Sequence, residues 1–325
     1  MIQRQWSFVT LIAFIGAVLG IGLEVRADLT GTYIAVGDSL AFGVGFDDST
    51  NDLSNGDRGY VKGLADLLQT RNGGVRPLVF DYGISGETSD SYFPLNIGTG
   101  VHGNTAAERN TNYANAVQTV SQEQLVLGRI ASEHTLGHQV SLITVQLGSN
   151  DLNKLLIDQA FAALTDPQKQ AAVGAALTNF AKNEAGLLQE LKIAAPEAKL
   201  VTLGYYNPFA PFLNITPTDA ATAQAKYAAQ QSQAALPALN QTIGGVTGNF
   251  PGAIFVDIMP SFVGNEFTYT YIAQGQVHPT SQGYSVITKQ LGVAVPEPSS
   301  FILIGLGIAG LVGISRRSRL NGIIA

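Results

Sequence analysis

A serine, an asparagine and a histidine stand out in this chain, because each lies in a short motif beside an apolar, β-branched run. Ser39 lies in Gly-Asp-Ser-Leu, Asn150 in Gly-Ser-Asn-Asp and His278 in Val-His-Pro. Such apolar runs form buried strands, so the three residues are expected at loop ends of one sheet. A serine hydroxyl becomes a useful nucleophile when a histidine base lies within hydrogen-bond distance. The motifs therefore predict a serine hydrolase.

Hydrolysis by a serine also needs hydrogen-bond donors for the oxyanion that forms when the hydroxyl attacks a carbonyl group. Asn150 can donate from its side-chain amide. His278 would deprotonate Ser39 and later protonate the leaving alcohol. The Gly-x-Ser-x-Gly elbow of the α/β-hydrolases does not occur in the sequence. We therefore expect a serine hydrolase of another kind.

These motifs resemble those of the GDSL-type esterases and lipases, or SGNH hydrolases, whose name records a serine, a glycine, an asparagine and a histidine in four sequence blocks. Ser39, Asn150 and His278 match the first, third and fourth blocks, and residues 82–88, Tyr-Gly-Ile-Ser-Gly-Glu-Thr, look like the second. The resemblance covers roughly residues 30–292, in the family's order. It implies an oxyanion hole made by the N–H groups of Ser39 and Gly86 with the Asn150 amide, and no cofactor.

The fourth block departs from the family pattern. An aspartate usually stands three residues before the histidine, and that position is Gly275 here. The aspartate orients the imidazole, and its loss in a serine hydrolase can lower turnover by about four orders of magnitude. A dyad oriented by a backbone carbonyl or by another acid can also work. Glu266 and Asp257 are the candidates for such an acid.

Each motif also has a structural interpretation. Ser39 could cap the helix after the first strand, Gly86 could serve a tight turn, and Asn150 could close the third strand. Four blocks in order favour catalysis instead. The pair His134 and His138 has the spacing of two metal ligands, but no cysteine and no supporting carboxylate at recognisable spacing accompanies it. We therefore expect surface histidines and no metal.

The amino-terminal residues predict export. Residues 1–27 contain Arg4, an apolar stretch over residues 8–23 and a final Val-Arg-Ala, a pattern typical of a signal peptide. An uncleaved anchor is the alternative, because Glu24 and Arg26 make the cleavage site imperfect. Signal peptidase is therefore an expected processing partner, and the hydrolase domain is predicted to span residues 28–294.

The carboxyl-terminal residues 295–325 combine Pro-Glu-Pro, an uncharged apolar stretch over residues 301–314 and an arginine cluster. A helix over that stretch would be about 21 Å long, short for a hydrocarbon core of about 30 Å. The three parts resemble the PEP-CTERM sorting signal, which implies exosortase-type processing and transient association with the inner membrane. The basic tail predicts a cytoplasmic end, which leaves the main domain periplasmic, on the cell surface or secreted. An ordinary membrane anchor is the alternative.

Composition supports one exported domain. The 325 residues include no cysteine, so disulfides cannot stabilise the fold, and about 265 residues between the two ends suffice for one core. The net charge is −6 and charged residues make up 13%, with no basic run outside the termini. Nucleic acid is therefore not an expected partner, because binding its backbone requires clustered lysine and arginine.

Apolar runs alternate with helical periodicity along the chain, which indicates a mostly parallel sheet with helices on both faces. The expected fold is α/β, and the resemblance implies a three-layer α/β/α flavodoxin-like SGNH-hydrolase fold with a mostly parallel five-stranded sheet. The catalytic motifs then follow the carboxyl ends of strands. Strands are predicted at 32–36, 78–82, 141–147, 199–203 and 253–257, and helices at 60–70, 114–133, 153–194, 218–237 and 281–291.

The substrate is expected to be an ester of a short-chain acyl group, an acetylated carbohydrate or a lipid. Polar loops at 46–58 and 92–112 favour a polar or carbohydrate-linked ester. The aromatic segment 205–209 could line the same mouth or pack in the core. A different function is prompted by Gly275: a catalytically weak surface or matrix-associated binding protein that retains the fold.

Overall fold

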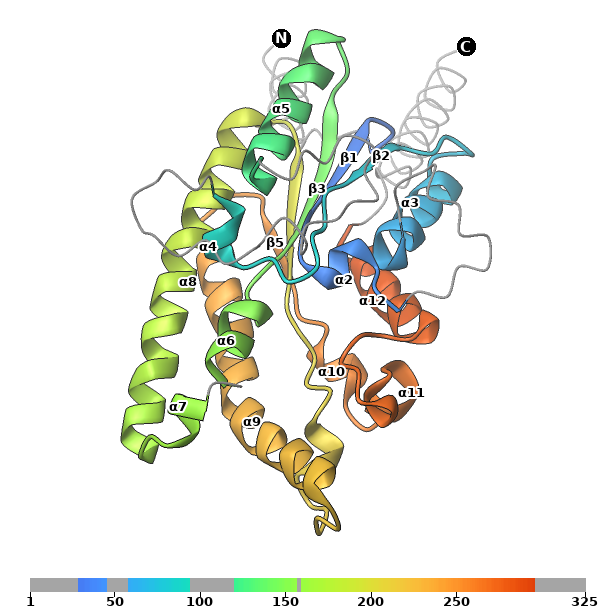
Figure 1. The fold of residues 1–325 in the computed structure, drawn as a ribbon. Helices are drawn as coiled ribbons and strands as arrows, with labels where there is room; N and C mark the ends of the chain where they lie inside the picture. Colours follow the sequence, from blue (N-terminus) through green and yellow to red (C-terminus); the bar gives the residue numbers. More distant parts are fainter. Residues whose placement is uncertain (1–28, 46–57, 94–119, 157–158, 296–325) are drawn as a thin grey trace, which may run out of the picture. The chain divides into compact units, whose positions relative to one another are not determined.

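A computed structural model of the chain describes residues 29–45, 58–93, 120–156 and 159–295. Its sheet has the strand order β2-β1-β3-β4-β5, and every neighbouring pair is parallel (Figure 1). This is the 2-1-3-4-5 order of flavodoxin-like folds, as expected. The strands are β1 (Thr32–Gly37), β2 (Leu78–Asp81), β3 (Val140–Gln146), β4 (Lys199–Leu203) and β5 (Ile254–Val256).

The central strands lie in the interior of the protein, because helices cover both faces of the sheet. Every residue of β1 and of β3 is buried. Strands buried on both faces are continuous apolar runs instead of alternating ones. This pattern made all five strands predictable from the sequence, each to within two residues of its observed bounds.

Helices cover both faces of the sheet and complete the three layers. Figure 1 shows α3 and α12 on one face, and α5, α8 and α9 on the other. The helices are α2 (Ser39–Phe42), α3 (Gly59–Arg71), α4 (Ser89–Tyr92), α5 (Gln122–Thr135), α6 (Ser149–Leu156), α7 (Gln159–Ala162), α8 (Asp166–Ala194), α9 (Ala220–Thr247), α10 (Met259–Phe262), α11 (Glu266–Tyr269) and α12 (Ser281–Ala294), with 3₁₀ turns η3 (Ala210–Phe212) and η4 (Ile272–Gln274).

The prediction of one helix over residues 153–194 was wrong, because the segment contains the separate helices α6, α7 and α8. A capping box starts α8, in which Thr165 and Gln168 satisfy each other's backbone N–H groups. Pro167 lies in the first turn, where its missing N–H costs nothing. These residues define a helix start, and the helical periodicity on both sides concealed it.

The prediction that a helix ends at Pro237 was also wrong. Helix α9 continues through Pro237 to Thr247. A proline inside a helix removes one hydrogen bond and costs about 3 kcal/mol. The apolar face beyond the proline outweighs this cost, because Leu239 and Ile243 are both buried against the sheet. Tertiary packing here overrides local propensity.

Several predicted segments lie outside the described residues. These are the signal peptide at 1–27, most of the loops at 46–58 and 92–112, the start of the helix predicted at 114–133, and the sorting signal after residue 295. Within the described ranges, no helix combines the length and the apolar character needed to cross a membrane.

Candidate active site

The serine follows directly from the end of β1. Asp38 caps α2 by accepting a hydrogen bond from the N–H of Leu40 at 2.9 Å, so that Ser39 is the first residue of the helix. Gly37 must lack a side chain, because a Cβ atom there would lie 2.4 Å from the carbonyl oxygen of Gln146. The serine therefore lies at the carboxyl end of the central strands, with 7% of its surface exposed.

The histidine reaches this serine from the other end of the chain. His278 lies between η4 and α12, and its Nε2 atom is 3.0 Å from Oγ of Ser39. The N–H of Tyr271 donates to the carbonyl of His278 at 3.0 Å, and the Tyr206 hydroxyl donates to the carbonyl of the preceding residue, Val277, at 2.6 Å. The structure thus brings together the two residues predicted as nucleophile and base.

The two other predicted oxyanion donors lie in the turn after β2 and at the start of α6, two segments that are hydrogen-bonded to each other. Gly86 has a φ of +83° in the turn closed by the hydrogen bond from Glu87 N–H to the carbonyl of Ile84, a conformation that favours glycine. The Asn150 amide donates to the carbonyl of Glu87 at 2.9 Å. The N–H of Ile84 also donates to the carbonyl of Gly37 at 3.0 Å, which ties this turn to the end of β1.

Asp38 connects the serine block with the asparagine block. Its carboxylate is fully buried and accepts hydrogen bonds from the Tyr205 hydroxyl at 2.8 Å and from Ser149 Oγ at 3.1 Å. Burial raises the pKa of Asp38 to about 6, although these hydrogen bonds act in the opposite direction. The arrangement fixes α2, α6 and the loop after β4 around one carboxylate.

A second carboxylate connects the asparagine block with the glycine block. Asp151 accepts hydrogen bonds from the backbone N–H and the hydroxyl of Ser89, the first residue of α4. Burial raises the pKa of Asp151 to about 6. The neighbouring Glu184 on α8 is 1% exposed, and burial followed by repulsion from Asp151 raises its pKa to about 8. Glu184 is therefore protonated at neutral pH.

These hydrogen bonds join the four sequence blocks. The first block is bonded to the fourth through Ser39 and His278. It is bonded to the second block through Gly37 and Ile84, and to the third through Asp38 and Ser149. The second and third blocks contact each other through Asn150 and Asp151. Chemically, this arrangement can present a hydroxyl nucleophile, an imidazole base and amide donors at one edge of the sheet.

Neither candidate for the orienting acid contacts His278. Glu266 is buried and accepts a hydrogen bond from the N–H of Gly264 at 3.2 Å. Asp257 is exposed and accepts from the Asn240 amide and the N–H of Met259, each at 3.0 Å. Across the described residues, the only side-chain hydrogen bond of His278 is with Ser39. Its pKa is lowered, and the cause is desolvation.

Gly275, at the family's usual aspartate position, has a backbone that favours glycine. It ends η4 in the left-handed conformation with a φ of +77°. A Cβ atom there would have no other heavy atom within 4 Å. The position therefore has room for a side chain, and only the backbone conformation disfavours one.

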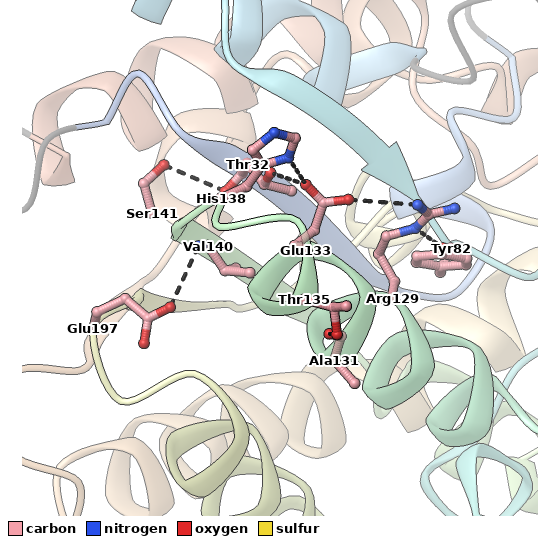
Figure 2. Close-up of polar contacts among 10 residues, drawn as sticks. All are labelled: Thr32, Tyr82, Arg129, Ala131, Glu133, Thr135, His138, Val140, Ser141 and Glu197. Carbon is pink, nitrogen blue, oxygen red and sulfur yellow. Dashed lines mark hydrogen bonds and ion pairs between the residues drawn. The ribbon is translucent and has the colours of Figure 1, made fainter.

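The pair His134 and His138 lies at the opposite edge of the sheet. Figure 2 shows His138 beside Glu133, with a distance of 3.0 Å between Nδ1 and Oε2. His134 instead contacts Glu197 at 2.7 Å. The two imidazoles thus bind different carboxylates, and the described residues contain no group of three or more ligands able to hold a metal ion.

Some of the residues that hold the site were not singled out from the sequence, namely Asp38, Ser149, Asp151 and Tyr206. The first three stand directly beside Ser39 or Asn150, so their positions in the motifs were a usable signal. Tyr206 lies in the aromatic segment after β4, and its hydroxyl bond to Val277 depends on the tertiary fold. No local pattern indicates that contact.

The family comparison agrees with this geometry. The model of the GDSL-like lipase/acylhydrolase family matches residues 35–286, which span all four blocks. The chain belongs to this family. The GDSL-family chain is accordingly a hydrolase of ester bonds, as the four blocks predicted. A search of curated protein sequences found no match.

Solved structures of GDSL-family and related lipases share the fold of this GDSL-family chain. A lipase from a goat rumen metagenome has 20% sequence identity and a TM-score of 0.53, with 82% of this chain and 98% of that chain covered. A putative GDSL-like lipase from Parabacteroides merdae has 13% identity and a TM-score of 0.50, with coverages of 83% and 98%. At such identities the likeness establishes the fold alone.

The carboxyl terminus of the GDSL-family chain matches a second family model. Residues 294–317 match the PEP-CTERM protein-sorting motif. The sorting signal inferred from Pro-Glu-Pro, the apolar stretch and the basic tail is therefore confirmed. It indicates export, with processing of the exosortase type.

Proposed function

We propose that the protein is an exported serine esterase that acts through an acyl-enzyme on Ser39. The distance of 3.0 Å between Ser39 Oγ and His278 Nε2 carries this proposal. His278 takes the hydroxyl proton as Oγ attacks the ester carbonyl, and then gives it to the leaving alcohol. Water, activated by the same imidazole, attacks the acyl-enzyme and releases the acid.

The oxyanion is stabilised by the N–H groups of Ser39 and Gly86 and by the Asn150 amide. The positive φ of Gly86 and the tie between Asn150 and the carbonyl of Glu87 support this assignment. Donors held by other bonds before the reaction need no reorganisation when charge develops. Asp38 and Asp151 are positioning residues, because each joins two of the loops that carry these donors.

The lowered pKa of His278 suits this role. Desolvation keeps the imidazole neutral at pH 7, which is the form that accepts a proton. The lack of a carboxylate contact among the described residues means that His278 is held by its backbone bonds and by Ser39. We therefore assign catalysis to a serine–histidine dyad, and leave Glu266 and Asp257 with structural roles.

The sorting motif supports export, with the hydrolase domain of residues 28–294 outside the inner membrane. The signal peptide directs the chain across that membrane, and the carboxyl-terminal segment holds it there until exosortase-type processing. The mature enzyme then acts in the periplasm, on the cell surface or after secretion. The motif match at residues 294–317 supports this sequence of events.

One observation favours an alternative function: Gly275 stands where the family usually has an aspartate, and no carboxylate among the described residues is hydrogen-bonded to His278. The alternative is a catalytically weak binding protein of the cell surface or matrix. Hydrolysis of p-nitrophenyl acetate and butyrate separates the two functions. We expect turnover by the parent protein and its loss in Ser39→Ala and His278→Ala variants that remain folded by circular dichroism. No turnover in the folded parent would support the binding protein.

A further inference from the structure

An apolar cavity of about 210 Å³ lies beside the candidate active site. It is lined by α6, α7, the first half of α9 and the loop after β4. Figure 1 shows α6 and α7 beyond the carboxyl ends of the strands, whereas α9 runs back along one face of the sheet. Its walls include the side chains of Tyr206, Phe209, Tyr227 and Leu236. The wall is therefore largely aromatic and aliphatic.

The cavity is lined by the chain neighbours of both residues of the dyad. Leu40 and Val277 line it, and they are the immediate chain neighbours of Ser39 and His278. Ser149, which directly precedes Asn150, lines it as well. A group bound in the cavity would thus lie next to the segments that carry the nucleophile, the base and the amide donor.

Most polar atoms in the wall already have partners within the protein. Tyr205 donates to Asp38, Tyr206 to the carbonyl of Val277, and Ser232 to Asn207 at 3.0 Å. These residues present ring faces or aliphatic atoms to the cavity instead of free hydrogen-bonding groups. The exposed residues Asn153 and Gln224 also line the cavity, and the buried hydroxyl of Tyr227 has no hydrogen-bond partner among the described residues.

We propose that this cavity binds the acyl chain of the ester, and that the preferred substrate carries an apolar acyl group of medium length. The inference rests on the serine esterase function proposed above and specifies its substrate. An apolar chain loses no hydrogen bonds when it enters such a wall, whereas an acetyl group would leave the cavity unfilled. The preference for a polar ester, inferred from the polar loops in the sequence, then applies only to the alcohol group of the ester and not to its acyl group.

The size of the cavity sets the chain length. A dry apolar cavity of about 150 Å³ holds benzene, so a volume of about 210 Å³ corresponds to roughly six to eight carbon atoms. Each methylene buried in an apolar site contributes about 0.8 kcal/mol, which is about fourfold in kcat/KM. The increase from acetate to hexanoate should therefore be on the order of 100-fold, with a plateau near octanoate.

Chain-length profiles of the full-length protein test this proposal. Ala228 on α9 lines the cavity and Ala162 lies exposed at its rim, so we would compare Ala228→Phe and Ala162→Phe with the parent on p-nitrophenyl esters from acetate to dodecanoate. Ala234→Phe is the matched control, because Ala234 is exposed on the same helix and does not line the cavity. We expect either cavity variant to lower kcat/KM for octanoate at least tenfold, with acetate changed less than twofold.

Binding to the Ser39→Ala variant separates this proposal from the esterase function. Octanamide, the neutral probe, should bind this variant at least tenfold more tightly than acetamide in calorimetry, and Ala228→Phe should remove the difference. Acetate as the best ester, or unchanged profiles in both cavity variants, would overturn the acyl-chain site while the esterase function stands. Octanamide binding without any hydrolysis by the parent would uphold the site and overturn the esterase function. Neither binding nor hydrolysis would overturn both.

Discussion

Two histidines near opposite ends of β1 have complementary surroundings. His278, at the carboxyl end, contacts Ser39 at 3.0 Å, and the described residues place no carboxylate against it. His138, at the amino end, lies 3.0 Å from the buried carboxylate of Glu133 and has no serine partner among the described residues (Figure 2). Each site therefore holds one of the two contacts that a complete triad makes.

The difference shows how a histidine's neighbours decide its role. Glu133 also accepts from the Thr32 hydroxyl at 2.8 Å and from Arg129, so its carboxylate joins the end of α5 to the start of β1. Burial alone would raise the pKa of Glu133, but the hydrogen bonds from Thr32, His138 and Arg129 lower it. His138 belongs to this structural network. His278 instead contacts Ser39, and Val277 beside it lines the cavity.

Removal of each imidazole gives the largest expected contrast. His278→Ala should lower kcat for p-nitrophenyl acetate by about 10³-fold or more, because the nucleophile loses its base. His138→Ala should leave kcat within about threefold of the parent, because that ring contacts only the Glu133 network. Steady-state kinetics of the two folded variants measures the contrast. Equal losses would mean that His278 is not the base.

A carboxylate added beside His278 should increase turnover. Gly275→Asp and Gly275→Asn place side chains of equal size on the same left-handed backbone, a conformation that both residues tolerate better than most. Only the aspartate can stabilise the imidazolium that forms during attack. We expect kcat to be at least tenfold higher in the aspartate variant than in the asparagine variant, an amount well within the effect of a triad acid. Equal kcat values would show that a carboxylate at this position does not act on His278.

Loss of the carboxylate beside His138 should affect stability and leave catalysis intact. Glu133 is 1% exposed, and Glu133→Gln weakens three hydrogen bonds at once. We expect a loss of about 1–3 kcal/mol in the free energy of unfolding at pH 7. Because the pKa of Glu133 is lowered in the folded state, its stabilising charge is present at neutral pH and is lost as the pH falls through that pKa. The difference between variant and parent should therefore shrink in acid, as urea unfolding at several pH values would show.

The smallest effect concerns the acidic limb of the rate profile. His278 must be neutral to act as a base, and desolvation lowers its pKa below the ordinary 6.5. The kcat/KM of the parent should thus be constant above pH 6.5 and fall only below it. In Gly275→Asp the added charge should move this limb upward by about one pH unit. If the kcat/KM of the parent already fell with decreasing pH above pH 6.5, this would indicate a carboxylate beside His278.

The sequence was sufficient to predict the sheet and the approach of Ser39 to His278. Continuous apolar runs defined β1 and β3, and family blocks at strand ends placed the polar residues at one edge. The helix bounds were harder to predict. Thr165 and Pro167 mark the start of α8 inside a long segment of helical periodicity, and buried leucines stabilise α9 beyond Pro237.

Glu266 and Asp257 were predicted as candidates for an orienting acid, but their hydrogen bonds involve other groups. Glu266 accepts from the N–H of Gly264, and Asp257 accepts from the N–H of Met259 and from the side-chain amide of Asn240 on α9. The sequence gives no sign of these partners. Similarly, the cavity beside the dyad is lined by residues from six separate segments, which are α2, α6, α7, the loop after β4, α9 and the loop before α12. Only the tertiary structure shows that they meet.

We propose above that His278 activates Ser39 without a carboxylate partner. Labelling of the protein by a fluorophosphonate, followed by mass spectrometry of the modified peptide, would show whether Ser39 is activated in this way. We predict modification of Ser39 in the parent and in His138→Ala, at a rate that depends on a group with a pKa below 6.5, and no modification in His278→Ala. An unlabelled Ser39 in the folded parent, or undiminished labelling in His278→Ala, would contradict the claim.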